Sequence, residues 1–426
     1  MSEGGARGPR LSRSLGEDNN MVTSPAVIAP SHGAGARAAG HVAEHTDPPT
    51  GPALTRVKPH ATAMLFMRPG KPHERVAVPQ VLLSSGEILV EVEFATICGS
   101  DIHTAQGRRA EPTPSVLGHE AVGRVVAIGG VVPALDGVPL VPGDRVVWSV
   151  TAHCGACDRC RRGIPQKCRS LRKYGHARLG QGWELTGGFA THVHLLAGTP
   201  VVRVDDEMPA AVLAPAGCGI PPAGAALAAA ERMLPLAGAT VLVTGAGLIG
   251  LAATAMARER GATVIVAEPD ADRRELARGF GAHAVLDPSA GETAASILAT
   301  RAPGGRAEVD VVIEASGSPL AVAAAFAAVT LGGVVVLVGS VFPTDPVPFV
   351  PEYLVRSQIT VTGVHNYAPE HLRGALDFLR EHWRSAPFEQ LVGRVYPLAE
   401  LDAALERAAR YREVRVGITP AGLRQR

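Results

Sequence analysis

Two short motifs offer a thiol and an imidazole 21 residues apart in the chain. The motif C-G-S-D-I-H begins at Cys98, and the motif L-G-H-E contains His119 and Glu120. Zinc prefers thiolate and imidazole ligands, whereas magnesium and calcium prefer oxygen. Cys218, in P-A-G-C-G, is a candidate third ligand, and three protein ligands would leave a fourth position open for chemistry. Each piece taken alone also fits a buried core cysteine or a solvated glutamate.

Four further cysteines lie close together in the sequence. Two, two and seven residues separate them: Cys154, Cys157, Cys160 and Cys168. Four thiolates complete a tetrahedral shell and leave no open position, which is typical of a structural zinc site. A redox C-x-x-C pair and two disulfides are the alternatives. Both are disfavoured, because a redox pair needs only two cysteines and a cytosolic chain rarely keeps disulfides.

The same lobe is rich in basic residues: Arg159, Arg161, Arg162, Lys167, Arg169, Arg172 and Lys173. They could form a solvated face that offsets the charge of the four thiolates. They could also bind an anionic group of a substrate. The sequence alone favours the first interpretation.

A glycine motif, G-A-G-L-I-G, separates a β-branched run from a helical pattern. Gly245 permits a tight turn, Gly247 lets the backbone approach a pyrophosphate, and Gly250 allows close packing of helix on strand. Glu268 ends the next strand, where a carboxylate binds the ribose hydroxyls and repels a 2′-phosphate, so NAD is favoured over NADP. Arg273 and Arg274 lie close enough in sequence to accept NADP. The predicted cofactor-binding residues are Gly245, Gly247, Leu248, Ile249, Gly250, Glu268 and Arg273.

Composition narrows the class of protein. The 426 residues have a formal net charge of +1, so neither nucleic acid nor a membrane is expected as a partner. The longest apolar stretches are strand-length and broken by glycine. Scarce cysteine spaced for metal binding indicates a reducing, cytoplasmic setting. Residues 1–60 lack helical or strand periodicity and predict a disordered tail without a catalytic role.

The pattern of apolar residues changes along the rest of the chain. Residues 87–94 alternate charged and apolar side chains, and residues 121–129 and 141–148 continue a β-rich region with glycine and proline at its turns. From about residue 236, strands alternate with helices. Their near-continuous apolar runs predict a parallel sheet covered on both faces. The last segment contains no glycine motif and is expected to return to the β-rich region.

With these motifs in this order, the chain resembles the zinc-dependent medium-chain alcohol dehydrogenases from about residue 64 to its end. The resemblance implies an α/β protein: a GroES-like β-rich catalytic domain at 61–219 with the zinc lobe at 154–168, a Rossmann doubly wound domain at 220–361, and a C-terminal return at 362–426. It also implies a homodimer or homotetramer that acts on a small-molecule alcohol. The tail before Met64 has no counterpart in the family. Pro221 and Pro222 are a second departure, and leave Cys218 the least certain ligand.

The resemblance also implies roles for individual residues. Catalytic zinc would lie on Cys98, His119 and Cys218, and structural zinc on the four lobe cysteines, giving two zinc ions per chain. Ser100 and His103 would relay a proton, Asp101 would orient the zinc-bound histidine, and Glu120 would be the nearby carboxylate. The implied reaction is reversible oxidation of an alcohol, with zinc as Lewis acid and NAD as hydride acceptor. A zinc- and NAD-binding scaffold without activity is the non-enzyme alternative.

A narrower resemblance is to a subgroup associated with phosphonate metabolism. It rests on residues 166–176, 183–192 and 365–369. This subgroup implies a phosphonate-bearing alcohol, with Arg172 or Lys173 as the contact. Tyr174, His176 and Asn366 are pocket candidates on the same ground, although interdomain packing explains them equally well. A polyol or short alcohol is the alternative substrate.

Overall fold

The computed structural model describes residues 54–301, 308–410 and 412–420. Most of the expected N-terminal tail lies outside the described residues. However, β1 (Thr55–Val57) pairs antiparallel with β4 (Val81–Leu83), so ordered structure begins before residue 61. The expected tail boundary at residue 60 is therefore too late.

A seven-stranded, mostly antiparallel sheet forms the centre of the catalytic region within the described residues. Its strands are β12 (Val201–Arg203), β8 (Arg145–Trp148), β7 (Glu120–Ile128), β5 (Ile88–Thr96), β20 (Arg415–Thr419) and β19 (Val392–Pro397) in spatial order, and β11 (His192–Leu195) pairs with β5. Along β5 only Glu91 and Glu93 are exposed, as the alternation of charged and apolar residues predicts. Smaller sheets contain β2 (Ala61–Phe66), β3 (Glu74–Val78) and β6 (Ser115–Val116), and β9 (Thr151–Ala152) with β10 (Arg172–Lys173).

Short helices and turns connect these strands. They are α1 (Gly99–Ala105), α2 (Asp158–Arg161), α3 (Ala210–Leu213), α11 (Leu401–Ala408), and the 3₁₀ turns η1 (Pro165–Lys167), η2 (Ala214–Gly217), η4 (Phe388–Leu391) and η5 (Leu398–Glu400). Helix α1 begins directly after β5, and Cys98 is its N-cap. The end of the central strand therefore positions Cys98, the first candidate zinc ligand.

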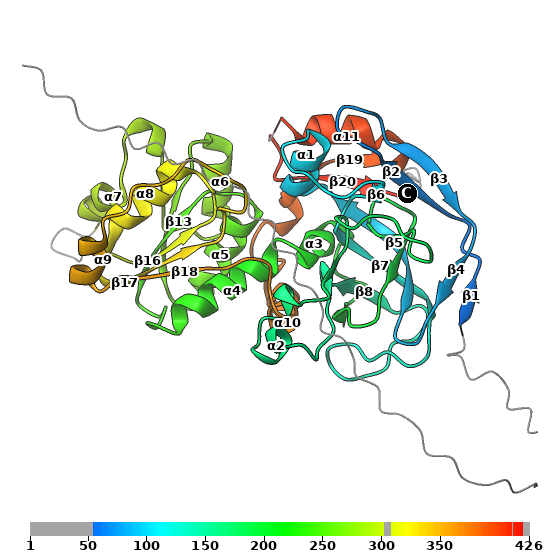
Figure 1. Ribbon diagram of the computed structural model, residues 1–426. Coiled ribbons are helices and arrows are strands. Elements are labelled where there is room, and N and C mark those ends of the chain that lie inside the picture. The colour runs from blue at the N-terminus through cyan, green and yellow to red at the C-terminus, as the bar shows by residue number, and fades with distance from the viewer. Residues whose placement is uncertain (1–53, 302–307, 411, 421–426) are drawn as a thin grey trace, which may run out of the picture. The chain divides into compact units, whose positions relative to one another are not determined.

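The coenzyme-binding region contains a six-stranded parallel sheet in the order β15-β14-β13-β16-β17-β18 (Figure 1). The strands are β13 (Thr240–Thr244), β14 (Thr263–Ala267), β15 (Ala284–Leu286), β16 (Val309–Glu314), β17 (Val329–Leu337) and β18 (Thr360–Gly363). The helices are α4 (Ile220–Glu231), α5 (Leu248–Glu259), α6 (Ala271–Gly279), α7 (Ala294–Arg301), α8 (Pro319–Ala328), α9 (Pro351–Ser357) and α10 (Pro369–His382), with a 3₁₀ turn η3 (Pro288–Ala290).

Both faces of the central strands of this parallel sheet are buried. Val241 and Val243 pack in one core together with α4, α5 and α10, whereas Leu242 belongs to a separate core with α8 and α9. Figure 1 shows α8 and α9 on the opposite side of the sheet from α4 and α5. The predicted doubly wound fold and the β-rich catalytic domain are both confirmed.

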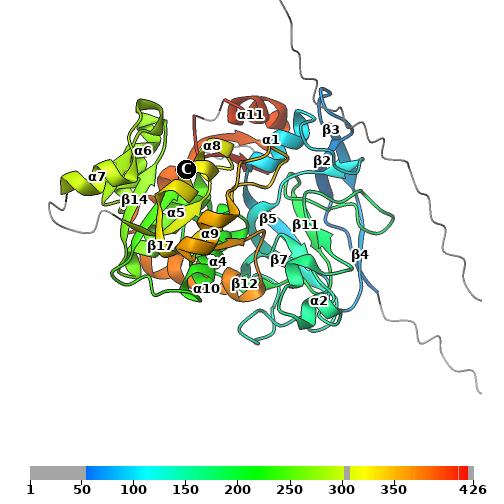
Figure 2. The ribbon, with the colours of Figure 1, turned by 60° about the vertical axis from the view of Figure 1, so that its left-hand side comes forward.

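The C-terminal segment returns to the catalytic region later than residue 362. Strand β18 extends to Gly363 in the parallel sheet, and α10 shares its core with α4. Only β19 and β20 join the catalytic sheet, and α11 lies beside α1 (Figures 1 and 2). The run of apolar residues before α10 is so short that the sequence did not identify it as the last strand of the parallel sheet.

Among the described residues no single helix has the length and apolar content to cross a membrane. One bent pair, Ala210–Gly217 with Ile220–Glu231, meets that test only when its two segments are taken together.

Candidate zinc and coenzyme site

Four side chains from three distant segments converge where the inner strands β5 and β7 of the catalytic sheet meet end to start. Cys98 lies between β5 and α1, His119 immediately precedes β7, Glu120 is the first residue of β7, and Cys218 follows η2. One ligand atom of each lies within 4.8 Å of all the others. Ligands about 2.0–2.3 Å from a tetrahedral zinc ion have comparable mutual separations. The two thiols and the imidazole therefore fit a zinc ion, and Glu120 lies at the remaining side of the cluster.

The two prolines after Cys218 do not disturb this arrangement. They occupy the first turn of α4, where the missing N–H of proline has no hydrogen bond to lose. Gly118, just before His119, has a φ of +86°, and a Cβ there would lie 2.7 Å from the ring of Phe189. Glycine is therefore required for the turn that presents His119.

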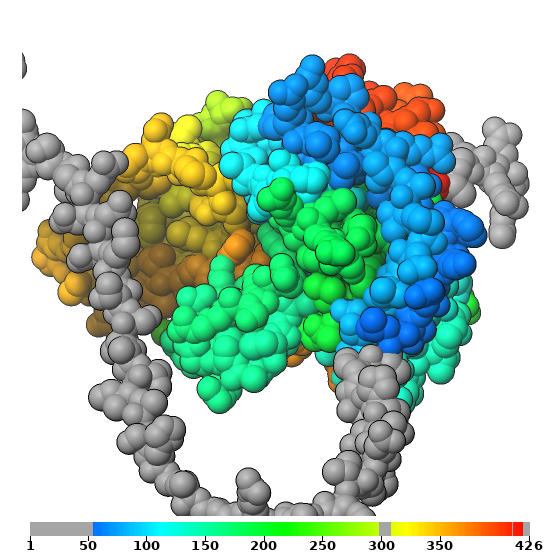
Figure 3. All heavy atoms as spheres, turned by 45° about the vertical axis from the view of Figure 1, so that its right-hand side comes forward, coloured from blue at the N-terminus to red at the C-terminus, as the bar shows by residue number. Residues whose placement is uncertain are grey.

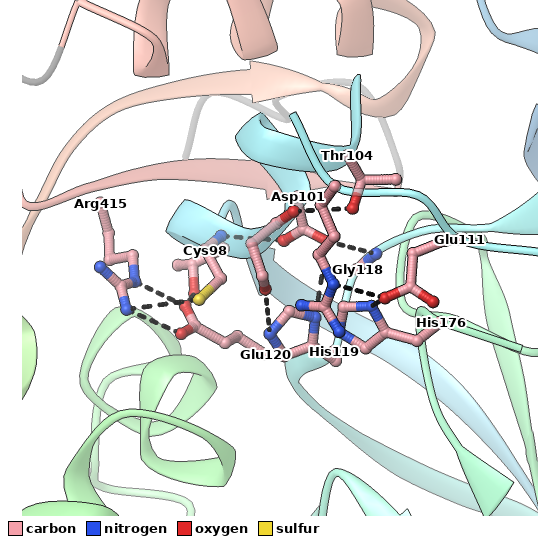
Figure 4. Close-up of polar contacts among 12 residues, drawn as sticks. Cys98, Asp101, Thr104, Glu111, Gly118, His119, Glu120, His176 and Arg415 are labelled. Atoms are coloured by element: carbon pink, nitrogen blue, oxygen red, sulfur yellow. Dashed lines mark hydrogen bonds and ion pairs between the residues drawn. The ribbon is translucent and has the colours of Figure 1, made fainter. Parts of the chain in front are cut away.

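Asp101 connects two of these segments from a fully buried position. Its Oδ2 accepts the N–H of Cys98 at 2.9 Å, and its Oδ1 accepts the N–H of Gly118 at 3.1 Å. Oδ1 also lies 3.5 Å from His119 Nδ1 (Figure 4). The carboxylate thus fixes the start of α1 against the turn that precedes β7, beside the imidazole that the family resemblance implies it orients.

Arg415 is part of this site, and the sequence analysis missed it. Its Nε and Nη2 donate to both oxygens of Glu120 at 2.7 and 2.9 Å, and Nη2 lies 3.8 Å from Cys98 Sγ (Figure 4). Thr96 Oγ1 donates a third bond to Glu120 at 2.7 Å. No local motif marks Arg415. The alternation in residues 414–418 predicts a strand, but it places Arg415 on the face opposite the apolar residues, where a solvent-exposed side chain would be expected.

The predicted proton-relay residues lie on α1. Ser100 Oγ is 3.3 Å from His119 Nε2, and His103 follows one turn later along the helix. The ring of Phe342, from the segment after β17, packs on His103 with the ring centroids 4.2 Å apart. Phe342 is a second residue without a sequence signal, because its segment shows no periodic pattern.

The four lobe cysteines form a second compact cluster around α2 and η1. One sulfur of each lies within 4.8 Å of all the others, and the sulfurs of Cys157 and Cys160 are 3.5 Å apart. All six cysteines of the chain are free of disulfides. This is the geometry expected of a closed four-thiolate metal site rather than of disulfide pairs.

The glycine motif forms the turn between β13 and α5. Gly245 has a φ of +90°, and a Cβ on Gly250 would lie 1.8 Å from the carbonyl oxygen of Gly245. A Cβ on Gly247 would meet no atom within 4 Å, so the backbone there faces open space. Glu268, at the end of β14, accepts the N–H of Ala246 at 2.7 Å and that of Asp270 at 3.1 Å. The predicted ribose-binding acid therefore lies at the glycine turn itself.

Comparison with known proteins identifies the family. The alcohol dehydrogenase GroES-like domain matches residues 84–206, and the zinc-binding dehydrogenase domain matches residues 249–381. An L-threonine 3-dehydrogenase of Streptomyces avermitilis is 35% identical over 68% of this chain and 79% of its own length. The chain belongs to the zinc-dependent medium-chain dehydrogenase family. It is an oxidoreductase of the zinc-dependent alcohol dehydrogenase type.

Other members of the family are similar over most of this chain. A geraniol dehydrogenase of Castellaniella defragrans is 32% identical over 78% of this chain and 89% of its own. A solved alcohol dehydrogenase of Thermotoga maritima is 30% identical, with a TM-score of 0.78 over 85% of this chain and 99% of its own. A zinc-binding dehydrogenase of Sinorhizobium meliloti bound to NADP has a TM-score of 0.71, with 28% identity over 84% of this chain and 99% of its own.

A cavity of about 270 Å³ in this zinc-dependent dehydrogenase joins the two motifs. It is lined by residues of α1, of the glycine turn and of β20, among them Gly99, Gly247, Leu248, Ile249, Arg273 and Arg415. Arg274 points elsewhere, because its Nη1 donates to the carbonyl of Glu268 at 2.7 Å and pairs with Asp287 at 3.1 Å. Of the two arginines that could accept NADP, only Arg273 faces the cavity.

The ionisable groups of the candidate catalytic zinc site shift one another's pKa values. Burial raises the pKa of Glu120 to about 7, although Arg415 opposes this shift. Burial tends to lower the pKa of His119, but the charges of Asp101 and Cys98 outweigh it and raise the pKa to about 10. The hydrogen bond from Cys218 lowers the pKa of Cys98, and the pKa of Cys218 itself rises. A cation shared by these ligands removes the competition, because it favours both thiolates and the neutral imidazole.

The three pocket candidates have different surroundings. Tyr174 is buried, and its hydroxyl bonds Thr199 Oγ1 at 2.6 Å, so it is a core residue of the lobe. His176 is also buried, with its ring centroid 4.7 Å from that of His119 and its Nδ1 3.1 Å from Glu111 Oε1 (Figure 4). Asn366 adopts a φ of 56° in the turn before α10. Of these candidates, only His176 contacts the cluster.

Proposed function

We propose that this dehydrogenase oxidises an alcohol to an aldehyde or ketone with NAD, and that Cys98, His119 and Cys218 hold its catalytic zinc. The supporting observation is the convergence of these three side chains, whose ligand atoms lie within 4.8 Å of one another beside a cavity that reaches the glycine turn. The four lobe cysteines hold a second, structural zinc.

The residues around the candidate zinc ligands have separate roles in the proposed reaction. Bound zinc would supply Lewis acidity, which lowers the pKa of a hydroxyl group by several units. Ser100 Oγ accepts the proton that the alcohol releases, and His103 passes it to solvent. Arg415 holds Glu120 at the cluster, and Asp101 fixes the orientation of His119. The alcohol loses two electrons and two hydrogens: one leaves as a hydride to NAD and the other as a proton.

NAD is the preferred coenzyme in this proposal. Glu268 places a carboxylate at the glycine turn, where it repels a 2′-phosphate and accepts ribose hydroxyl groups. Arg273 faces the same cavity and leaves NADP as the alternative.

The alcohol could be a phosphonate-bearing one, as the narrower resemblance implies, or a neutral polyol or short alcohol. The two basic candidates for a phosphonate contact lie side by side on β10. Arg172 is exposed, with its guanidinium 5.9 Å from the ring centroid of Trp183. Lys173 is partly buried and close enough to Cys98 and Cys218 for their charges to affect its pKa. Lys173 is therefore the better candidate.

We also propose a homodimer or homotetramer in a reducing cytoplasm. Strand β18 is an edge of the parallel sheet, and exposed apolar side chains surround it: Leu331, Phe349, Val350, Tyr353, Val355 and Val361. An unpaired edge strand with apolar neighbours pairs readily with a second copy.

Metal counting and a coenzyme assay test the proposed function. We expect two zinc ions per chain and NADH formation with at least one simple alcohol. Cys98→Ser and His119→Ala should each lose one zinc and all turnover while NADH still binds. One zinc in the unaltered chain, together with no turnover, would favour the scaffold alternative.

A further inference from the structure

The basic residues of the lobe fall into two groups in the structure. Arg169 pairs with Asp158 at 2.6 Å, and Arg159 donates to the carbonyl of Lys167 at 2.9 Å. These arginines are engaged within the exposed part of the lobe and fit a solvated basic face. Lys167 and Lys173 differ, because both extend from the lobe toward other segments of the chain.

Lys173 faces the interior from a two-residue strand. In β10, Arg172 pairs with Ala152 and Lys173 with Thr151, so their side chains point to opposite faces. Burial, followed by the charge of Arg109, lowers the pKa of Lys173. Among the described residues, the side-chain ammonium of Lys173 forms no hydrogen bond and no ion pair. A partly buried ammonium without a partner is costly, so an anion beside it would be stabilised.

Zinc binding strengthens this argument. The anionic neighbours of Lys173 are Glu111 and the two thiols of the cluster. A zinc ion offsets the charge of both thiolates. Glu111 is already paired with Arg109 at 2.5 Å. Lys173 would then retain most of its positive charge uncompensated near the candidate catalytic zinc site.

Lys167 contacts a different part of the chain. Its Nζ bonds Nδ1 of His365, in the turn after β18. Figure 3 shows the green lobe against orange residues of the coenzyme-binding region. An ammonium group only donates hydrogen bonds, so His365 Nδ1 must accept and the ring hydrogen must lie on Nε2. His365 therefore presents an N–H donor next to the lysine.

These groups form one basic cluster: Arg109, Lys167, Lys173 and His365. Burial lowers the pKa of His365, and the charges of Lys167, Lys173 and Arg109 lower it further, so each of these three cations lies within electrostatic reach of His365. The members come from three segments: the turn after α1, the zinc lobe and the turn after β18. The cluster thus lies where the lobe meets the coenzyme-binding region, and Lys173 extends it to the catalytic cysteines.

We propose that the basic cluster binds an anionic group of the alcohol substrate, with Lys173 as its principal contact. This inference rests on the proposed alcohol dehydrogenase activity. It specifies the substrate as an alcohol with a phosphonate, phosphate or carboxylate group a few bonds from the reacting hydroxyl. Arg172, which the sequence made an equal candidate, is excluded from the contact because it points to the outer face.

Three substrates of similar length test the proposal: 2-hydroxyethylphosphonate, 3-hydroxypropanoate and propan-1-ol. The holoenzyme should show the lowest KM with one of the two anions, and which anion it is distinguishes a dianionic from a carboxylate ligand. Lys173→Met should raise the KM of that anion about 10- to 100-fold, the range typical of losing one charge-assisted hydrogen bond. Its effect on propan-1-ol should stay within about twofold.

Arg172→Met is the matched control, because it removes a charge from the same strand on the opposite face. It should leave all three KM values nearly unchanged. Lys167→Met is a second test variant, in case Lys173→Met folds poorly, and should also raise the KM of the anion selectively. Titration of methylphosphonate or acetate into the zinc-loaded NADH complex gives a readout without turnover. Affinity should fall in Lys173→Met and weaken with added salt in the unaltered protein.

The outcomes separate this inference from the proposed function. Turnover of propan-1-ol with no preference for either anion would overturn the basic cluster alone. Equal KM changes for charged and neutral substrates in Lys173→Met would do the same. No turnover of any alcohol by the two-zinc protein would instead overturn the proposed function.

Discussion

Glu120 is a fully buried carboxylate whose charge depends on one distant arginine. Arg415 donates two hydrogen bonds to it, and Thr96 donates a third. Removing one partner of such a buried pair leaves an uncompensated charge, which costs much more than the pair itself contributes. Arg415 therefore stabilises the site mainly by preventing Glu120 from being buried alone.

Arg415→Met should lower the free energy of unfolding by about 3–5 kcal/mol. Urea unfolding of the zinc-loaded protein measures this change. The double variant Glu120→Gln with Arg415→Met should recover part of the loss, because the amide carries no charge to leave unpaired. If the double variant were less stable than Arg415→Met, the buried charge would not be the cause.

A further prediction concerns two glycines with different surroundings. Gly250→Ala should destabilise the fold by about 1–3 kcal/mol, because its Cβ would meet the carbonyl of Gly245 at 1.8 Å. Gly247→Ala should keep the stability, since its Cβ meets no protein atom, but should weaken NADH binding if the pyrophosphate lies there. Thermal unfolding and NADH fluorescence measure the two effects, and equal stability loss in both variants would contradict this assignment.

At the level of residues, the sequence predicts a site residue only where its type and its spacing from other residues are distinctive. Cys98, His119 and Cys218 stand out because few side chains bind zinc, and their motifs are short. Arg415, Thr96 and Phe342 do not, since each has an ordinary residue type and meets the site only through folding. The choice of Lys173 over Arg172 as the contact for an anionic substrate group also required the structure. Only the strand register shows that their side chains point to opposite faces.

Lys167 of η1 contacts His365 in the turn after β18, and this contact joins the zinc lobe to the region of the parallel sheet. Burial and then the charge of Lys167 lower the pKa of His365 to about 4, whereas an unfolded histidine has a pKa of about 6.5. Between these values the unfolded chain binds more protons than the folded one. The free energy of unfolding should therefore fall as the pH drops from about 6.5 to about 4.

Replacing His365 by glutamine should remove this part of the acid sensitivity. Urea unfolding from pH 7 to pH 4 should show a smaller loss of stability in His365→Gln than in the unaltered protein. Parallel stability curves for the two proteins would show that the imidazole does not change its protonation on unfolding. Lys58, in an exposed segment, offers a control substitution that should leave the pH profile unchanged.

Most elements with regular periodicity follow from the sequence. The apolar run of β13, the glycine turn and α5 were predictable, since buried parallel strands and glycine turns have distinct patterns. Strand β18 could not be predicted as part of the parallel sheet, because its four residues alternate in exposure and lack the continuous apolar run of a buried parallel strand. The sequence therefore placed most of it in the C-terminal return. Short β1 was assigned to the tail for a similar reason: three exposed or partly exposed residues give no periodic signal.

At the scale of the whole molecule, the edge of the parallel sheet is the expected contact with a second copy. Val361→Lys places a charge on β18, where 38% of the valine is exposed. It should shift the protein toward monomers in sedimentation experiments. Met233→Lys is the control, since Met233 is 57% exposed and follows α4, outside β18 and its exposed apolar neighbours. An unchanged oligomer in Val361→Lys would place the interface elsewhere.

The order of the catalytic sheet could not be derived from the sequence. The last segment was expected to return to the β-rich region, but nothing local in the sequence indicates that β20 inserts between β5 and β19. Strand insertion depends on long-range pairing, for which alternation within a five-residue strand is insufficient. The return nevertheless completes the site, because it brings Arg415 to Glu120.

This placement has a consequence for protein synthesis. Arg415 follows Glu120 by 295 residues. At about 5–20 residues per second, a ribosome needs roughly 15–60 s to translate that interval. Once residue 218 has been translated, the nascent chain contains every thiol of both cysteine clusters, but until residue 415 it lacks the guanidinium that neutralises the buried carboxylate. A polypeptide that stops before β20 would thus contain all the candidate zinc ligands but no arginine beside Glu120, so completion of the candidate site depends on translation of β20.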